Sequence, residues 1–237
     1  MKLSFQIKTI IKAAMMVFCF TMLHAQERSY TVSIHGSITT SSRLFFNPYD
    51  ADEISRNQSL PINGVWGIGI DFRRTLKGNS LYIGLSAEYL KVRERLEIQD
   101  SNGAIVIADD GYVAFPVELT GYFCIPFNSE SFRMYMGGGV GAYFGERLYA
   151  YASFVSQVVE RKPGFGIHVL SGFEVDLLPF LVLRSEVKFR EVQFESTNVF
   201  PQPTYVSGTP LPNDNLPFRS RISIDGILVN AGIAYRF

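Results

Sequence analysis

Hydrophobic residues of this chain alternate with polar or small ones in segments of roughly ten residues, the length of a membrane-spanning β-strand. Between Val65 and Arg73, for example, tryptophan, isoleucine and phenylalanine alternate with glycine, aspartate and arginine. Period-2 alternation places the two kinds of side chain on opposite faces of a strand. The pattern predicts eight strands, over residues 30–38, 65–73, 81 to about 94, 112–125, 132 to about 147, 165–177, 181 to about 194, and about 223 to 237.

The predicted connections alternate between long and short. Those after the first, third, fifth and seventh strands cover roughly residues 41–63, 97–110, 148–163 and 195–222, whereas the others cover 75–79, 126–131 and 178–180. Outer-membrane barrels combine an even number of antiparallel strands with long outer loops and short periplasmic turns. We therefore expect an all-β fold, an eight-stranded antiparallel transmembrane up-and-down β-barrel in the bacterial outer membrane, with both termini periplasmic.

The polar faces of the second to seventh strands carry charges of both signs among many glycines. The charged residues are Asp71, Arg73, Glu88, Glu118, Arg133, Glu174, Asp176, Arg184, Glu186, Lys188 and Arg190. Inside a narrow barrel, small residues fit the crowded space and opposite charges can pair away from lipid. A soluble lipocalin-like binder has the reverse arrangement, with its apolar face around an internal ligand, and is the alternative fold.

The N-terminus has the three parts of a secretory signal peptide. Lys2, Lys8 and Lys12 precede an apolar run, residues 13–23, which is too short for a transmembrane helix, and Ala25 suits the position before a cleavage. We expect a signal peptide over residues 1–25 and one barrel domain over residues 26–237. Cys124 is then the one cysteine of the mature chain, so an intramolecular disulfide is excluded. The formal net charge of +0 indicates no nucleic-acid partner.

Three stretches carry a family resemblance: Ala114–Glu118, Tyr135–Tyr143 and the closing Ala231–Phe237. With them the chain resembles small outer-membrane barrels of the OmpA/OmpX-like kind and, within that kind, the Bacteroidetes barrel-domain proteins related to PorT. The resemblance implies a fold and a location but little about activity. It also implies that Phe237, supported by Tyr235, is the signal read by the barrel assembly machinery. An aromatic girdle, with both rings facing lipid at the periplasmic rim, explains the same two residues.

Charges on the sixth and seventh strands are expected to meet, because a tight turn joins these strands and brings Glu174 to the level of Arg184. We expect a lumen charge network of Glu118, Arg133, Glu174, Asp176, Arg184, Glu186 and Lys188. The interior of an eight-stranded barrel is just wide enough for side chains to fill, which favours a paired plug. A narrow, porin-like channel, opened when these charges exchange partners, is the alternative.

The sequence predicts no catalytic, cofactor-binding or metal-binding residue. His35 and His168 are the two histidines of the expected mature chain, and spacing joins neither of them to both a serine and a carboxylate. The glycine-rich run from Gly137 to Gly141 lies in a strand pattern and lacks the lysine and helix of a phosphate-binding loop. A lipid-modifying enzyme is a weaker hypothesis, which requires a serine within hydrogen-bond reach of either histidine.

Long loops above a rigid barrel are a common place for function. Aromatic and proline residues are frequent at Arg43–Tyr49 within loop 41–63, and at 200–205 and 209–212 within loop 195–222. These segments can bind an extracellular protein or glycan, or pack on one another as a lid. The sequence thus predicts an integral outer-membrane protein with a structural or surface-interaction role, whose other partners are membrane lipid and the barrel assembly machinery.

Overall fold

The computed structural model describes residues 29–77, 80–99, 103, 105–126, 129, 131–152, 154–200, 205–206, 209–210 and 216–237. The expected signal peptide, residues 1–25, lies outside the described residues. In chain order the elements are β1 (Tyr30–Phe45), α2 (Glu53–Asn57), β2 (Ser59–Lys77), β3 (Leu81–Gln99), β4 (Ile105–Cys124), β5 (Phe132–Tyr151), β6 (Phe154–Val155), β7 (Gln157–Lys162), β8 (Gly164–Leu178), β9 (Leu181–Val199), β10 (Tyr205–Val206), β11 (Thr209–Pro210), β12 (Phe218–Ile224) and β13 (Ile227–Arg236). No helix among the described residues is long and apolar enough to cross a membrane.

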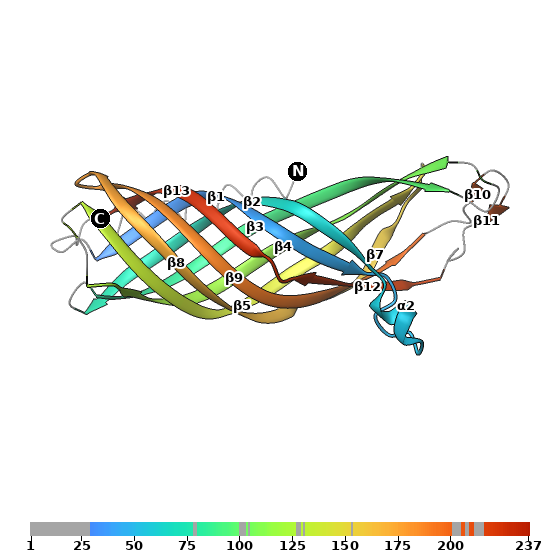
Figure 1. Cartoon of the computed structure of the whole chain (residues 1–237), viewed down its shortest axis with the longest axis horizontal. Coiled ribbons are helices and arrows are strands. Elements are labelled where there is room, and N and C mark those ends of the chain that lie inside the picture. The colour runs from blue at the N-terminus through green and yellow to red at the C-terminus, as the bar shows by residue number, and fades with distance from the viewer. Residues whose placement is uncertain are drawn as a thin grey trace, which may run out of the picture.

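The long strands close into one antiparallel ring (Figure 1). Its order is β1–β2–β3–β4–β5–β8–β9–β13, and β13 pairs back with β1 from Thr31 opposite Arg236 to Thr39 opposite Leu228. β12 also pairs with β1 and β9, so β12 and β13 together form the eighth strand of the wall, interrupted at Asp225 and Gly226. The structure confirms the predicted eight-stranded antiparallel up-and-down β-barrel.

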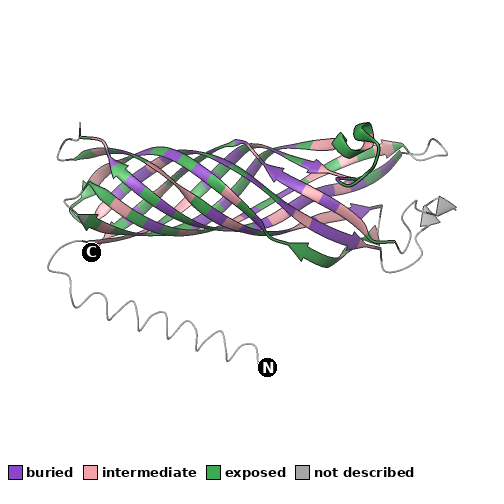
Figure 2. Cartoon of the chain, turned by 90° about the horizontal axis from the view of Figure 1, so that it is seen from below, coloured by how far each residue is buried: buried purple, intermediate pink, exposed green. Residues whose placement is uncertain are grey.

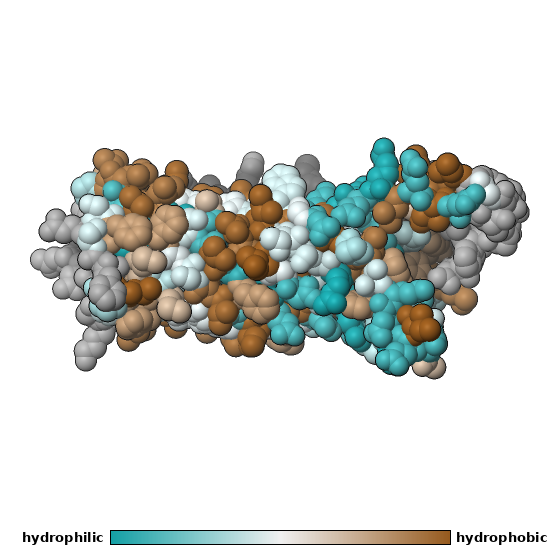
Figure 3. Space-filling view, viewed as in Figure 1, coloured by the Kyte–Doolittle hydropathy of each residue, from teal (hydrophilic) through white to brown (hydrophobic). Residues whose placement is uncertain are grey.

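The outer surface of the barrel changes polarity along its length. We call the half that holds the C-terminus and the short turns after β2, β4 and β8 the proximal half, and the half that holds α2, β7 and β12 the distal half. Hydrophobic side chains gather over the proximal half, whereas hydrophilic ones gather around β12 and α2 (Figure 3). On β3, the outward side chains are first Leu81, Ile83, Leu85, Ala87 and Tyr89, and then Lys91, Arg93, Arg95 and Glu97.

The interior changes polarity in the opposite sense. On β3, Ser86 and Glu88 point inward in the proximal half, and Leu90 and Val92 point inward in the distal half. The distal interior next to the charged lumen is a hydrophobic cluster, made of Leu44, Ile62, Val65, Leu90, Val92, Tyr112, Ala114, Tyr143, Val192, Phe194, Ile222 and Ile224. Beyond it, a buried ion pair joins Arg147 to Asp110, and a second, smaller hydrophobic cluster surrounds Phe200. Burial raises the pKa of Tyr112 to about 12, so its phenol stays neutral in this core. The distal half is therefore packed like a soluble barrel, and the proximal half is its inverse.

Aromatic residues lie at both ends of the outer apolar surface. At the distal edge lie Trp66, Tyr89, Phe115 and Phe144, and the rings of Tyr89 and Phe115 are 5.0 Å apart. At the proximal edge lie Tyr30, Phe72, Phe180 and Tyr235. Aromatic girdles of this kind flank the apolar band of outer-membrane barrels.

The predicted long connections were wrong in extent, because much of each is strand. β1 and β2 cover residues 41–45 and 59–63, β3 and β4 cover 97–99 and 105–110, and β9 and β12 cover 195–199 and 218–222. On β2, β3 and β12 the outward side chains of these segments are mostly polar, so a search for lipid-facing alternation ends too early there, whereas β4 still exposes Ile105 and Ile107. Alternating burial nevertheless continues along the strands into the distal half (Figure 2).

The expected lipid exposure of Phe237 was also wrong. Its side chain is 7% exposed, because it lies between the rings of Tyr30 and Tyr235, at centroid distances of 6.0 Å and 6.1 Å. Tyr235 itself is exposed, as expected. The terminal residue is held in the wall by two backbone hydrogen bonds with Tyr30, of 2.9 Å and 3.0 Å.

The distal core predicts a difference between two leucines of the same strand. Leu90→Ala, in the core, should lower the free energy of unfolding by about 2–5 kcal/mol because it leaves a cavity. Leu85→Ala, at an outward proximal position, should cost clearly less, since it leaves no internal cavity. Urea titration of the refolded protein in lipid vesicles measures both, and equal losses would contradict the assignment of Leu90 to a packed core.

Candidate functional site

The proximal lumen holds a balanced set of charges. Its ion pairs join six carboxylates, Asp71, Glu88, Glu118, Glu174, Asp176 and Glu186, to six cations, Arg73, Arg133, Arg184, Lys188, Arg190 and Arg236, among the described residues. All of them point inward because the strands keep one phase of alternation through this half. A buried ion costs several kcal/mol unless it is paired, so equal numbers of each sign allow the interior to be filled.

The middle of this network joins four strands of the wall. Arg73 on β2 lies 2.7 Å from Asp71 and 2.5 Å from Glu186 on β9. Arg184 also reaches Asp71, at 2.5 Å. Tyr135 donates a hydrogen bond of 2.7 Å to Glu186. The guanidinium of Arg73 also lies over the ring of Tyr122, 3.9 Å from its centroid, so it is held by charge and by an aromatic face together.

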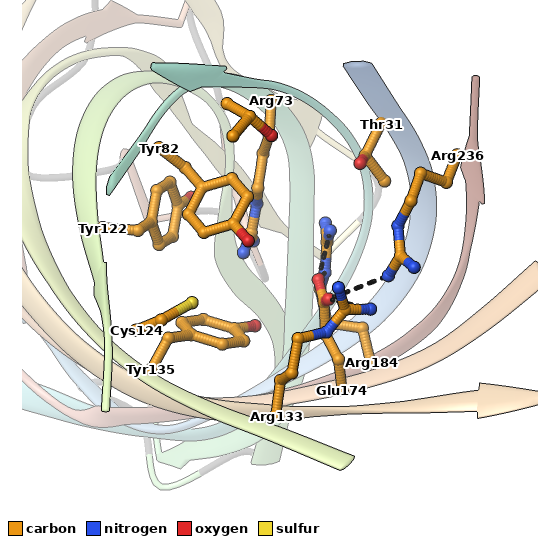
Figure 4. Close-up of a pocket in the computed structure, with 11 residues that line it drawn as sticks. Thr31, Arg73, Tyr82, Tyr122, Cys124, Arg133, Tyr135, Glu174, Arg184 and Arg236 are labelled. Carbon is orange, nitrogen blue, oxygen red and sulfur yellow. Dashed lines mark hydrogen bonds and ion pairs between the residues drawn. The ribbon is translucent and has the colours of Figure 1, made fainter. Parts of the chain in front are cut away.

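The part nearest the C-terminus is centred on Glu174. Glu174 and Arg184 are register partners on β8 and β9, and their side chains lie 2.7 Å apart. Arg133 and Arg236 each approach Glu174 at 3.4 Å and also contact Asp176, at 2.6 Å and 3.2 Å. Figure 4 shows the three guanidinium groups around the carboxylate of Glu174.

A pocket of about 160 Å³ lies at this end of the lumen (Figure 4). Its wall contains Thr31, Arg73, Thr75, Tyr82, Tyr122, Cys124, Arg133, Tyr135, Glu174, Arg184 and Arg236. A second cavity, farther in between His35 and Asn230, has only about 10 Å³, which is about the space of one water molecule. The lumen thus narrows sharply from its proximal mouth toward the middle.

The part of the network next to the distal core is the most deeply buried. Lys188 lies 2.5 Å from Glu118, which also accepts a 2.5 Å hydrogen bond from Tyr143. Arg190 lies 3.0 Å from Glu88, and its side chain is 0% exposed. An open aqueous pore would leave its lining groups exposed, so side chains fill the lumen at this level.

The histidines form no catalytic triad in the described part of the chain. His168 Nε2 lies 2.8 Å from Thr120 Oγ1, and its Nδ1 has no hydrogen-bond partner. A triad needs a carboxylate at that second nitrogen and a hydroxyl that substrate can reach. His168 and Thr120 are both buried. The described residues also contain no group of three or more histidine, cysteine or acidic side chains placed to hold a metal ion.

All seven residues expected in the lumen charge network are brought together by the structure. Five further members, Asp71, Arg73, Glu88, Arg190 and Arg236, were not included in the expected network, although the same alternation places them inward. The tyrosines that bond to the carboxylates were missed as well. Their signal is the occurrence of Tyr122, Tyr135 and Tyr143 on the polar rather than the apolar face of their strands.

Comparison with known proteins shows the fold. No family model matches the chain, and no curated protein matches it. Similar solved structures include the outer membrane protein OprG from Pseudomonas aeruginosa, with 15% identity, a TM-score of 0.56, and coverage of 88% of this chain and 95% of OprG. They also include Neisserial surface protein A, with 12% identity, a TM-score of 0.45 and coverage of 88% and 97%. Ail of Yersinia pestis has 12% identity, a TM-score of 0.41 and coverage of 88% and 99%. The likeness to OprG is one of fold, that of a small outer-membrane β-barrel.

The lumen pairs predict a marked difference between single and double substitutions. Lys188→Met leaves Glu118 without its nearest cation and should lower the free energy of unfolding by about 3–5 kcal/mol. Adding Glu118→Gln removes the uncompensated charge and should recover much of that loss. Arg161→Met, at an exposed pair with Glu146, is the control and should cost less than about 1 kcal/mol. Urea titration tests all three, and a double variant less stable than the single one would contradict the pairing.

Proposed function

We propose that the chain is an integral outer-membrane protein whose proximal half spans the bilayer and whose distal half projects from it in a structural or surface-interaction role. The observation that carries this proposal is the double reversal of polarity, apolar outside and charged inside proximally, charged outside and apolar inside distally. Both halves are stable together only if lipid surrounds the proximal half and water surrounds the distal half. A membrane strand needs about 9–11 residues, and β3 has 19, so about half of it extends beyond the hydrocarbon.

A soluble lipocalin-like binder fits less well. Its outer surface faces water along the whole barrel, whereas the proximal outer surface exposes large apolar side chains on every strand of the ring. Between the two aromatic edges, the described outward positions of the proximal half carry no charged side chain. Such a surface is suited to lipid.

The buried lumen favours a plugged barrel over a channel. Glu118 and Arg190 are buried at mid-barrel, and the hydrophobic cluster around Leu90 and Phe194 fills the distal lumen above them. A continuous water path would have to displace both layers. A narrow channel formed by partner exchange in the lumen charge network is the second candidate, supported by the pocket of about 160 Å³ beside Glu174 at the proximal end of the lumen.

The distal end supplies the surface for a partner. Two long segments connect the strands at the distal end, residues 46–58, which contain α2, and residues 200–217. Both segments are shorter than the expected loops 41–63 and 195–222. Phe200 lies in a small cluster with Tyr149 and Phe218, so the start of segment 200–217 is packed against β5 and β12. We propose an extracellular protein or glycan as the partner of the remaining exposed surface. The likeness to PorT-related proteins stays a prediction from sequence, since no family model matches the chain.

Bilayer recording separates the plugged barrel from the channel. The purified protein should insert into vesicles and resist extraction by carbonate, and it should show no well-defined conductance steps in a planar bilayer. Glu174→Gln should leave this result unchanged. Regular steps in the wild type that change in the Glu174→Gln variant would overturn the plugged barrel in favour of the channel, and release by carbonate would overturn membrane insertion.

We also propose that both termini are periplasmic and that Tyr235 and Phe237 form the signal for the barrel assembly machinery. Phe237→Ala and Tyr30→Ala remove the same ring contact, of 6.0 Å, but only the first changes the chain end. In cells, Phe237→Ala should reduce the amount of folded protein in the outer membrane several-fold more than Tyr30→Ala, as measured by heat-modifiable gel mobility. Equal reductions would show that the ring serves only to pack the rim.

A further inference from the structure

The outward face of β3 carries an unassigned cluster of cations just beyond the distal aromatic edge. Lys91, Arg93 and Arg95 occupy successive outward positions, directly after Tyr89. The side chains of Arg93 and Arg95 are 50% and 73% exposed. Lys91 is the register partner of Trp66, which is itself 70% exposed on β2. The cluster therefore begins at the level where the apolar surface ends.

Neighbouring strands only partly neutralise this cluster. On β4, the residues opposite Lys91 and Arg93 are Val113 and Gly111, which carry no charge. Asp109 is the carboxylate opposite Arg95, and both arginines share it, at 3.1 Å and 3.5 Å. The next outward residue on β3 is Glu97, one step farther from the apolar surface. Arg93 and Arg95 thus share Asp109, and Lys91 has no ion pair among the described residues.

Several other cations of the distal surface are paired with carboxylates. Arg43 pairs with Asp225, and Arg161 pairs with Glu146. Glu195 on β9 lies 3.5 Å from Arg221 and 3.8 Å from Lys162. β9 also presents Glu191 outward, next to the apolar surface. β9 is four strands from β3 around the ring, so Glu191 lies on the wall opposite the cluster.

We propose that Lys91, Arg93 and Arg95 bind the phosphate groups of anionic lipid headgroups in the leaflet from which the distal half projects. The inference rests on the membrane insertion proposed above and names the lipid class that this face prefers. Lysine and arginine side chains next to an apolar belt can lie along it while their charged ends reach the headgroups. Guanidinium groups match phosphate oxygens in geometry as well as charge. The position of the cluster favours a lipid phosphate as the ligand, because the acyl chains of the same lipids cover the apolar surface directly beside the cluster.

The single tryptophan of the chain reports on this site without a label. Trp66 fluorescence is measured in vesicles of phosphatidylcholine and phosphatidylglycerol in which one lipid at a time carries bromine at carbons 6 and 7 of one acyl chain. At equal mole fraction, brominated phosphatidylglycerol should quench Trp66 more strongly. We expect phosphatidylglycerol to be enriched roughly fivefold over phosphatidylcholine next to the cluster. This ratio corresponds to about 1 kcal/mol, the attraction of one cation to an anionic lipid surface. In 1 M NaCl, where the Debye length is about 3 Å, the preference should largely disappear.

Two matched triple variants complete the test. In the variant Lys91→Gln/Arg93→Gln/Arg95→Gln, the two brominated lipids should quench Trp66 fluorescence equally. Arg161→Gln/Lys162→Gln/Arg219→Gln also removes three distal cations, but from β7 and β12, and should keep the preference. Equal quenching by both lipids in the wild type, or a preference that survives in the β3 variant, would overturn the inference alone. Absence of quenching by either lipid would overturn membrane insertion and the inference with it.

Discussion

Closure of eight strands into a narrow ring is the constraint on which the structure depends. Once β13 pairs with β1, inward side chains from opposite walls must share one small volume. Arg184 on β9 illustrates the result, since it contacts Glu174 on the adjacent strand and Asp71 on β2 across the lumen. Each buried charge must find a partner within this volume, so the charges of seven different strands are fixed together. Sheet closure and charge balance therefore stabilise each other.

The change of solvent along the barrel explains why one sequence carries two opposite patterns. In the proximal half, the apolar side chains face outward to lipid, whereas charged and small side chains fill the narrow lumen. In the distal half, water accepts residues such as Arg95, and the lumen takes Leu90 and Phe194 instead. The two arrangements meet at the level of Arg190, whose side chain contacts Glu88 and Thr39 and lies near the ring of Tyr143. The hydrophobic effect drives the distal half as in a soluble domain, whereas pairing of charges organises the proximal lumen.

Alternation in the sequence predicts the proximal half well, because lipid tolerates few exceptions on the outward face. The strand number, the short turns and the inward direction of Glu118 and Lys188 all follow from it. Distal extensions such as residues 59–63 were not predicted, since their outward residues are polar and resemble loops. On β1 and β2 the inward phase also changes, from Thr39 to Ser42 and from Val65 to Ile62, so a strict period of two fails there. Contacts across the lumen, such as Arg73 with Glu186, depend on barrel closure and cannot be derived from the spacing of residues along the chain.

The interruption at Asp225 and Gly226 lies beside these phase changes on β1 and β2. A side chain at Gly226 would meet the carbonyl oxygen of Ser41 at 2.5 Å, and Gly64 has a positive φ of 63°. The eighth strand of the wall, β1 and β2 are thus irregular at one level, whereas β3, β4 and β9 keep the same alternation through this level. An irregularity of this kind accommodates an added or deleted residue without changing the strand register in the proximal half. In the proposed membrane arrangement, a change of length in the projecting half therefore need not disturb the frame of the lipid-facing half.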